Sequence, residues 1–308
     1  MKTLLPGTLK ADALLLLTAL IWGVAFVAQR AGMDHMGPFI YNAVRFGLGA
    51  ASLLPVIWYR QKKGLVDHAF QKHTDKSALL KAGIISGLLL FLGSSLQQVG
   101  IVYTTAGKAG FITGLYVVIV PVLGLIWKIR PGPGVWLGAL LAASGLYFLT
   151  ITDGLRIEFG DFLVLLCAVA FALHVLAIGW LVTKVDCVKL AAAQFLVTSV
   201  LSFIVALVFE EILLSSLRDG LIPILYGGIM SAGVAYTLQI VAQREALPGH
   251  AAIILSLESV FAVIAGWMIL SEYLGIREIS GCILMFSGML AAQIYHLRRK
   301  PPSFRWGI

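Results

Sequence analysis

Glu258 is a carboxylate inside an otherwise apolar run that extends from Ala251 to Leu270. A helix needs about twenty apolar residues to cross the hydrocarbon core of a bilayer, and an ionisable group within such a span usually faces a protein interior. On a helix Glu258 shares its face mostly with small side chains, including Ala262 and Ala265, so we expect this face to pack against other helices. Glu258 is either a substrate- or proton-binding group or a hydrogen-bonding group that holds two helices together.

Other polar-tipped residues lie in apolar runs of the same kind. His174 is in the middle of one, where a histidine is either a packed neutral hydrogen-bonder or a proton carrier. Trp22, Tyr116 and Tyr236 are aromatic residues within such runs, and they either form the wall of an apolar, weakly selective cavity or fill the core.

The composition indicates that the chain is built for a bilayer. Hydrophobic residues make up 59% of it and charged residues only 12%, against about 25% charged residues in an average soluble domain. The net charge of +8 lies in short basic runs between apolar segments and forms no continuous face, so no nucleic-acid partner is indicated. The three cysteines are odd in number and far apart, so they indicate neither a disulfide framework nor a metal site. No enzyme or cofactor signature is present either, and we expect no catalytic function and no cofactor.

Ten apolar segments have the length of a membrane span, which predicts an all-α integral membrane protein with ten transmembrane helices. The segments are 11–29, 38–59, 78–102, 107–127, 134–151, 160–181, 188–209, 220–242, 249–270 and 275–297.

The basic residues predict the orientation of these spans. If the N-terminus is cytoplasmic, most Lys and Arg residues lie on the cytoplasmic side, including those of the loop 60–77 and of the short C-terminal tail. Cytoplasmic loops are enriched in Lys and Arg, so we expect both termini in the cytoplasm.

The two halves of the chain resemble one another, which predicts a repeat. The segment that starts at Leu96 aligns without gaps to the segment that starts at Leu238, and this places Gln97 opposite Gln239 and Tyr116 opposite Glu258. Asp12 and Asp161 correspond in the first and sixth spans. Each half therefore has five spans, 1–152 and 153–308, and because five is odd the second half is inverted in the membrane. Transporters with inverted repeats bind their substrates near the midplane between the halves, so we expect Gln97 and Gln239 to line a central cavity.

Three stretches carry a resemblance to a known family. They are "GPFIYNAVRFGLGA", "GFITGLYVVIVPVLG" and "LESVFAVIAGWMILSEYLGIREISGCILMFSGM", and with them the chain resembles the EamA-type members of the drug/metabolite transporter superfamily over nearly its whole length. The resemblance implies ten helices in two inverted five-helix repeats, a central cavity and transport by alternating access.

The resemblance also bears on single residues. Trp22 in "LIWGVAF" is similar to the family's first cavity-lining helix, and the family-like position of Arg45 favours a structural ion pair over substrate binding. Pro121 and Gly107 suggest a fourth span that either bends during transport or packs closely. The second half has the acidic residue Glu272 near the end of its fourth span, and the first half lacks a counterpart, which is a departure from full equivalence of the two ends and not from the fold.

These observations favour a secondary transporter that exports small organic metabolites, such as amino acids, related metabolites or drugs, across the plasma or bacterial inner membrane, with or without coupling to protons. Phosphorylated or nucleotide-linked sugars are the alternative substrate, and they would require several basic residues at the depth of the cavity. A non-transporting membrane protein or a membrane enzyme is the remaining class. The expected partners are a small-molecule substrate, the lipid bilayer and protons, without an obligatory protein partner.

Overall fold

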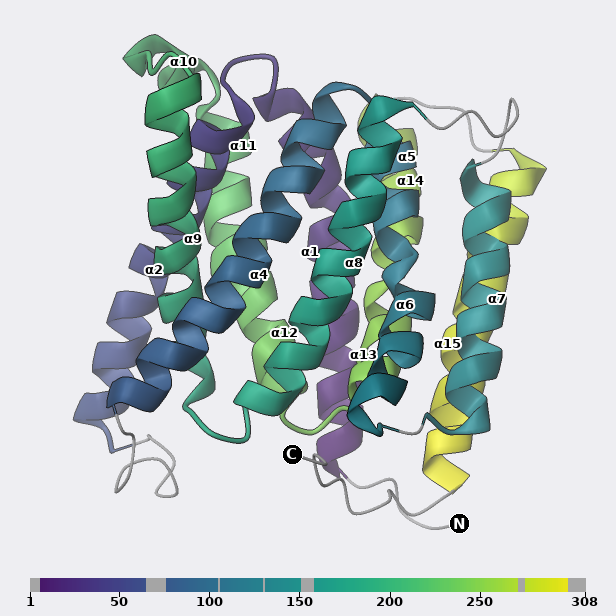
Figure 1. The fold of residues 1–308 in the computed structure, drawn as a ribbon. Coiled ribbons are helices and arrows are strands. Elements are labelled where there is room, and N and C mark those ends of the chain that lie inside the picture. The colour runs from purple at the N-terminus through teal and green to yellow at the C-terminus, as the bar shows by residue number, and fades with distance from the viewer. Residues whose placement is uncertain are drawn as a thin grey trace.

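The computed structural model describes residues 6–64, 76–104, 106–129, 131–150, 158–270 and 275–298, and the described part is helical, without a strand. Glu272 lies outside these residues. The helical segments are α1 (Pro6–Gly32), α2 (Pro38–Lys62), α4 (Lys76–Val102), α5 (Ala106–Gly114), α6 (Tyr116–Gly124), the 3-10 helix η1 (Leu125–Trp127), α7 (Pro133–Thr150), α8 (Phe159–Leu181), α9 (Cys187–Phe209), α10 (Leu214–Asp219), α11 (Leu221–Leu225), the π-helix η2 (Tyr226–Tyr236), α12 (Thr237–Ala242), α13 (Pro248–Leu255), α14 (Glu258–Leu270) and α15 (Ile276–Arg298). They form one upright bundle (Figure 1).

Eight helical segments in the described part of the chain are long and apolar enough to cross a membrane. Two shorter apolar stretches, Pro133–Gly145 and Ile279–Ala292, belong to α7 and α15. The chain is therefore an integral membrane protein that crosses the bilayer several times. That α7 and α15 also cross it, to make ten spans, stays a prediction, as does the inverted relation between the two halves.

Helices α1 and α8 occupy the middle of the bundle. Helix α1 packs against α14, η2, α12, α13 and α5, and α8 packs against α4, α5 and α6. The two central helices bring buried faces of both halves of the chain together, and the candidate site lies where these faces meet.

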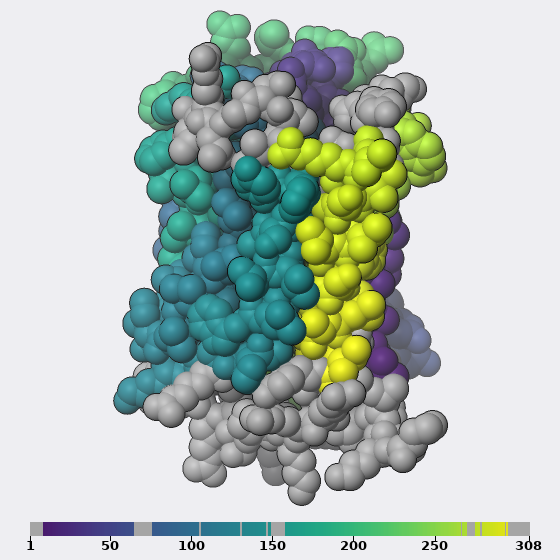
Figure 2. All heavy atoms as spheres, turned by 90° about the vertical axis from the view of Figure 1, so that its right-hand side faces the viewer, coloured from purple at the N-terminus to yellow at the C-terminus, as the bar shows by residue number. Residues whose placement is uncertain are grey.

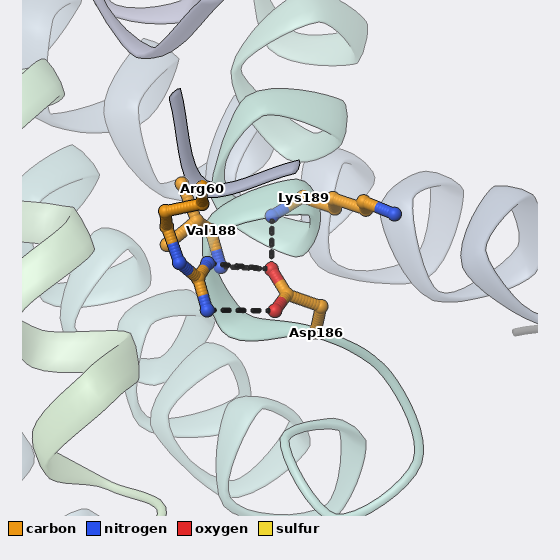
Figure 3. Close-up of polar contacts among 4 residues, drawn as sticks. All are labelled: Arg60, Asp186, Val188 and Lys189. Carbon is orange, nitrogen blue, oxygen red and sulfur yellow. Dashed lines mark hydrogen bonds and ion pairs between the residues drawn. The ribbon is translucent and has the colours of Figure 1, made fainter. Parts of the chain in front are cut away.

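Helices α2 and α9 form a closely packed pair whose ends are tied together by side chains. At one end the Glu210 carboxylate accepts hydrogen bonds from the backbone amides of Phe39 and Ile40, both at 2.8 Å. At the other end Asp186 is the N-cap of α9, and its carboxylate also accepts two hydrogen bonds from the Arg60 guanidinium, each at 3.1 Å (Figure 3). Amide donors at a helix start lack intrahelical partners. Glu210 of α9 therefore provides acceptors for the start of α2, whereas Asp186 caps its own helix α9 and also binds Arg60 near the end of α2.

Helices α7 and α15 lie side by side on one face of the molecule (Figure 2). Their backbones approach closely where glycines meet, because a Cβ atom on Gly138 would lie 2.9 Å from the carbonyl oxygen of Gly288. Small residues at a contact of this kind let apolar helices pack closely within a membrane.

Two of the long segments are broken at their middle. Leu115 separates α5 from α6, and Ser256 and Leu257 separate α13 from α14. At both breaks an amide bonds three residues back: Leu115 N to Ile112 O, and Leu257 N to Ile254 O, each at 3.2 Å. Leu115 and Leu257 correspond in the alignment of the two halves, so the breaks lie at matching places in the sequence.

Candidate functional site

A cavity of about 30 Å³ lies between the central helices. A water molecule needs at least about 10–15 Å³ of such space, so the cavity in this conformation has room for about two waters and not for a metabolite. Its lining contains all seven residues that the sequence analysis singled out for substrate or proton binding, together with Arg45. The lining consists of Trp22, Phe26, Gln29, Arg45, Gln97, Thr113, Tyr116, Phe171, His174, Val175, Ser231, Tyr236, Gln239, Leu255 and Glu258.

Glu258 is the first residue of α14, directly after the break in that segment. Its side chain is buried, with 4% of its surface exposed. Gly23 of α1 makes the placement possible, because a Cβ atom there would lie 2.8 Å from the carbonyl oxygen of Glu258 and closer still to Phe261. The carboxyl group therefore sits at a helix start that packs against the central helix.

Tyr116 occupies the corresponding place in the other broken segment, as the first residue of α6. Its ring is buried, and both it and Glu258 line the cavity. The phenol lies beside the Glu258 carboxyl. The Tyr116 hydroxyl has no hydrogen-bond partner of good geometry in the described part of the chain. The two residues that the alignment pairs thus meet in space.

Arg45 extends from α2 into the same cavity and is 2% exposed. Its guanidinium lies over two aromatic rings, 4.7 Å from the centroid of Phe46 and 5.4 Å from that of Tyr41. Arg45 forms no ion pair with an acidic side chain of the described residues, and its Nε has no hydrogen-bond partner among them. Cation–π contacts of this kind are worth about 2 kcal/mol when they are desolvated.

An aromatic cluster forms one wall of the cavity. The rings of Trp22 and Tyr236 are 4.5 Å apart, and the Trp22 indole donates a hydrogen bond to the Ser231 carbonyl oxygen at 3.3 Å. Tyr236 also contacts the rings of Phe46 and His174. The candidates Trp22, His174 and Tyr236, from the first, sixth and eighth predicted spans, therefore lie together in one wall, and Phe46 packs behind Tyr236 without lining the cavity.

Amide side chains and a histidine supply the remaining polar lining. Gln97 donates to the Thr113 hydroxyl at 3.2 Å, and Gln239 donates to the Gln243 side chain at 2.9 Å. His174 Nε2 lies 3.0 Å from Oε1 of Gln194, and its donor or acceptor role depends on the tautomer. Each candidate thus has a partner that orients it.

The two residues proposed for bending or close packing lie in the broken fourth segment. Pro121 is inside α6, six residues beyond the break at Leu115. Gly107 is in the first turn of α5, and a Cβ atom there would meet nothing within 4 Å. Close packing at Gly107 is therefore not the reason for a glycine at that position.

Sequence reasoning missed several of the lining residues. Gln29, Thr113 and Ser231 are polar, and Phe26 and Phe171 are apolar. The sequence did contain a signal for Thr113, because it is a polar residue three positions before Tyr116, on the same side of a helix. In the structure Thr113 on α5 accepts the hydrogen bond from Gln97 on α4. The apolar residues had none, because an apolar side chain in a membrane span faces lipid, core or cavity with the same composition.

The site brings together a carboxyl group, a guanidinium, a phenol, amides and aromatic rings. Four polar atoms of its lining have no hydrogen-bond partner among the described residues: Gln29 Oε1, Arg45 Nε, Tyr116 Oη and Gln239 Oε1. Buried polar atoms are normally paired with protein or ordered water, so this cavity is equipped to bind something polar. No cluster of metal-ligating side chains occurs among the described residues.

Comparison with known proteins gives the relationships of the chain. It is 34% identical over 291 residues to a protein named "Uncharacterized transporter" from Archaeoglobus fulgidus, covering 94% of this chain and 87% of that one. It is 22% identical over 289 residues to "Uncharacterized transporter YoaV" from Bacillus subtilis, covering 91% and 96%. A solved structure described as "Crystal structure of protein" has the same fold, with a TM-score of 0.75 at 17% identity over 94% of this chain and 98% of that one.

The model of the EamA-like transporter family matches the chain twice, over residues 9–151 and 158–292. The two matches cover most of the sequence and include every residue that lines the cavity. Family and relatives indicate a transporter. The chain belongs to the EamA-like transporter family.

Proposed function

We propose that the protein is a secondary transporter that exports small organic metabolites across the plasma or bacterial inner membrane by alternating access. Glu258 binds a proton or a cationic group of the substrate, in alternation or in competition. The observation that carries this proposal is the buried Glu258 carboxyl at a helix break beside the central cavity.

The chemistry follows from the position of Glu258 away from water. An ionised carboxylate that is buried without a neutralising partner is costly, and ionisable groups within membrane spans mark substrate and proton pathways. No ion pair of Glu258 occurs among the described residues. A proton or a substrate cation would neutralise the carboxylate, and each would have to leave before the other binds.

The small cavity volume fits a conformation in which neither side is open. A metabolite requires a larger cavity, about 300–1,000 Å³ for a drug-sized ligand, so the helices around the site must separate during transport. The breaks at Leu115 and at Ser256–Leu257 interrupt two of the lining segments. They support the proposal that these segments bend there, because discontinuous helices at the binding site are a recurring feature of transporters.

The composition of the lining supports the substrate class. Arg45 and Glu258 offer opposite charges, the glutamines offer uncharged donors and acceptors, and Trp22 and Tyr236 offer aromatic surface. Zwitterions, amphipathic amines and aromatic metabolites each match part of this lining. Export is the direction that the family resemblance implies, and the basic loops support cytoplasmic termini.

Phosphorylated or nucleotide-linked sugars fit less well. Among the described residues Arg45 is the one Lys or Arg in the lining of the cavity, whereas Lys108 binds Asp161. A site for a substrate with several negative charges would place more cations around it. A scaffold that binds nothing would leave the unpaired polar atoms of the cavity without a partner.

The test is a comparison of wild type with Glu258→Gln. The substrate is first identified as a metabolite that accumulates outside cells only when the protein is present. We expect the glutamine variant to reach the membrane at normal abundance, because it keeps the shape of the side chain, and to lose the pH dependence and most of the rate of efflux from vesicles. Glu258→Asp should retain part of the activity.

Glu211→Gln is the matched control, because Glu211 is exposed beyond the end of α9, and it should transport like the wild type. If Glu258→Gln transports at the wild-type rate with unchanged pH dependence, Glu258 is only a hydrogen-bonding group between helices and the proposed mechanism is wrong.

A further inference from the structure

Two contacts between a carboxylate and a basic side chain join the two halves of the chain at opposite ends of the bundle; the contact that involves His250 is an ion pair when the imidazole is protonated. Near the start of α5, Lys108 Nζ lies 2.6 Å from Oδ2 of Asp161, in the first turn of α8. Near the start of α13, His250 Nε2 lies 2.8 Å from Oδ1 of Asp12, on α1. Helices α5 and α8 begin at the upper end of Figure 1, whereas α1 and α13 begin at the lower end.

The four residues correspond in pairs within the sequence. Asp12 aligns with Asp161, and the gapless alignment that pairs Gly107 with Gly249 also pairs Lys108 with His250. Each half therefore donates one carboxylate and one basic side chain, and each carboxylate binds the basic residue of the other half. Neither the carboxylates nor the basic residues line the cavity.

Both pairs are partly or largely shielded from water. The carboxylates of Asp161 and Asp12 are 4% and 14% exposed, and His250 and Lys108 are 5% and 35% exposed. Asp161 is held further by the Thr104 hydroxyl, at 2.8 Å, and by the backbone amide of Glu158, at 3.0 Å. Removing one partner of a shielded pair costs more than breaking an exposed surface pair, because it leaves a charge without compensation away from water.

Each basic residue is placed on a half-helix that ends at a break. Lys108 lies about two helical turns before Leu115, and His250 lies about two turns before Leu257. The segments that follow the breaks begin with Tyr116 and Glu258, the paired residues of the cavity. A movement of α5 or α13 about its break would thus separate one of the two contacts and leave Tyr116 and Glu258 in place.

We propose that these two ion pairs are equivalent latches, one at each end of the cavity, and that each must separate for its own end to open. Lys108–Asp161 closes the end at which α5 and α8 begin, and His250–Asp12 closes the end at which α1 and α13 begin. Both latches are closed in this structure, in agreement with the small volume of the cavity. The inference rests on the alternating access of the proposed function and adds the contacts that control it.

The test measures access to the cavity from each side and needs no substrate. The three native cysteines are replaced by serine, and Ser231→Cys supplies one thiol in the lining of the cavity. Right-side-out and inside-out vesicles are then treated with a membrane-impermeant maleimide, and the labelling rate of the single thiol is followed. Membrane abundance and thermal stability of every variant are recorded.

We expect Lys108→Ala and Asp161→Asn to raise the labelling rate from one side only, by about five-fold or more, because a lost closing contact shifts a two-state equilibrium toward the open state. His250→Ala and Asp12→Asn should raise it from the opposite side. His250→Lys should label at the same rate as the Ser231→Cys protein without this change, because a Lys–Asp pair then replaces the His–Asp pair, as in the Lys108–Asp161 latch. Exchange of the two residues, as in Lys108→Asp with Asp161→Lys, should restore slow labelling.

Arg30→Ala is the matched control. Arg30 forms an ion pair with Asp34 at 3.2 Å, and because both residues belong to the first half, this pair does not connect the two halves. The proposal is overturned if both sets of variants open the same side, if folded variants of neither set change the labelling, or if Arg30→Ala acts like them. Loss of transport in Glu258→Gln is measured separately, so either proposal can fail while the other stands.

Discussion

At the scale of single residues, Arg45 shows how a charge is accommodated in the apolar centre of the bundle. Its guanidinium lies over the rings of Phe46 and Tyr41 instead of against a carboxylate of the described residues. A guanidinium is planar and weakly hydrated and stacks well on aromatic rings, whereas the ammonium of lysine is compact and strongly hydrated. The aromatic neighbours therefore suit arginine better than lysine.

We expect Arg45→Lys to lower the stability of the folded protein by about 1–2 kcal/mol, the size of a desolvated cation–π contact. The measurement is thermal unfolding in detergent, followed by the exposure of buried thiols. Arg30→Lys makes the same change at an exposed ion pair and should leave the unfolding temperature nearly unchanged. Equal unfolding temperatures for Arg45→Lys and wild type would show that the ring contacts contribute nothing specific.

At the scale of the elements, the α7–α15 contact depends on close approach of two backbones. An alanine Cβ at position 138 would lie within 3.0 Å of the Gly288 carbonyl oxygen, the Ala292 Cβ and the Ile253 side chain. Because one of these atoms belongs to the backbone of α15, the helices must shift to admit the methyl group. Overpacking of this kind typically costs about 1–3 kcal/mol.

Gly138→Ala should therefore lower the unfolding temperature of the purified protein, although alanine is the better helix former. Gly107→Ala is the matched control, since a Cβ atom there meets nothing within 4 Å, and alanine is favoured over glycine in a helix by about 1 kcal/mol. The control should leave the unfolding temperature unchanged or raise it. The opposite order of the two variants would contradict the observed packing of α7 on α15.

At the scale of the whole molecule, the distribution of basic residues predicts which end of the bundle faces the cytoplasm. Lys63, beyond the end of α2, and Asp219, at the end of α10, are both exposed and lie at opposite ends of the bundle (Figure 1). In a variant without native cysteines, Lys63→Cys should react with an impermeant thiol reagent only from the cytoplasm. Asp219→Cys should react only from outside.

Permeabilised vesicles should label both positions and so show that each thiol is reactive. The reverse pattern in sealed vesicles would invert the orientation and exchange the roles of the two latches. Labelling of both positions from one side would contradict the arrangement of α2 and α10 in the bundle.

The sequence by itself determined that the protein belongs in a lipid bilayer, that its fold is helical and that it resembles the EamA-like transporter family. A run of about twenty apolar residues is enough to identify a membrane-spanning segment. Such a segment must be helical, because its backbone amides and carbonyls find no hydrogen-bond partners in lipid and must pair with one another. Polar residues inside such runs are few, so Glu258, His174, Gln97 and Gln239 stood out without a structure, and all four line the cavity. Their roles in transport remain predictions.

Only the tertiary structure decided which side chains meet. Lipid tails and a protein interior are equally apolar, so the pattern along a span does not say which face turns inward, and Phe26 and Phe171 could not be assigned to the cavity. The contacts Lys108–Asp161 and His250–Asp12 join residues that are distant in the chain. The helix break at Leu115 directly follows Gly114, and the other break contains Ser256, whose hydroxyl donates to the Ile253 carbonyl oxygen at 2.9 Å. Glycine and serine also lie inside the unbroken helix α4, so these residue types alone do not locate the breaks.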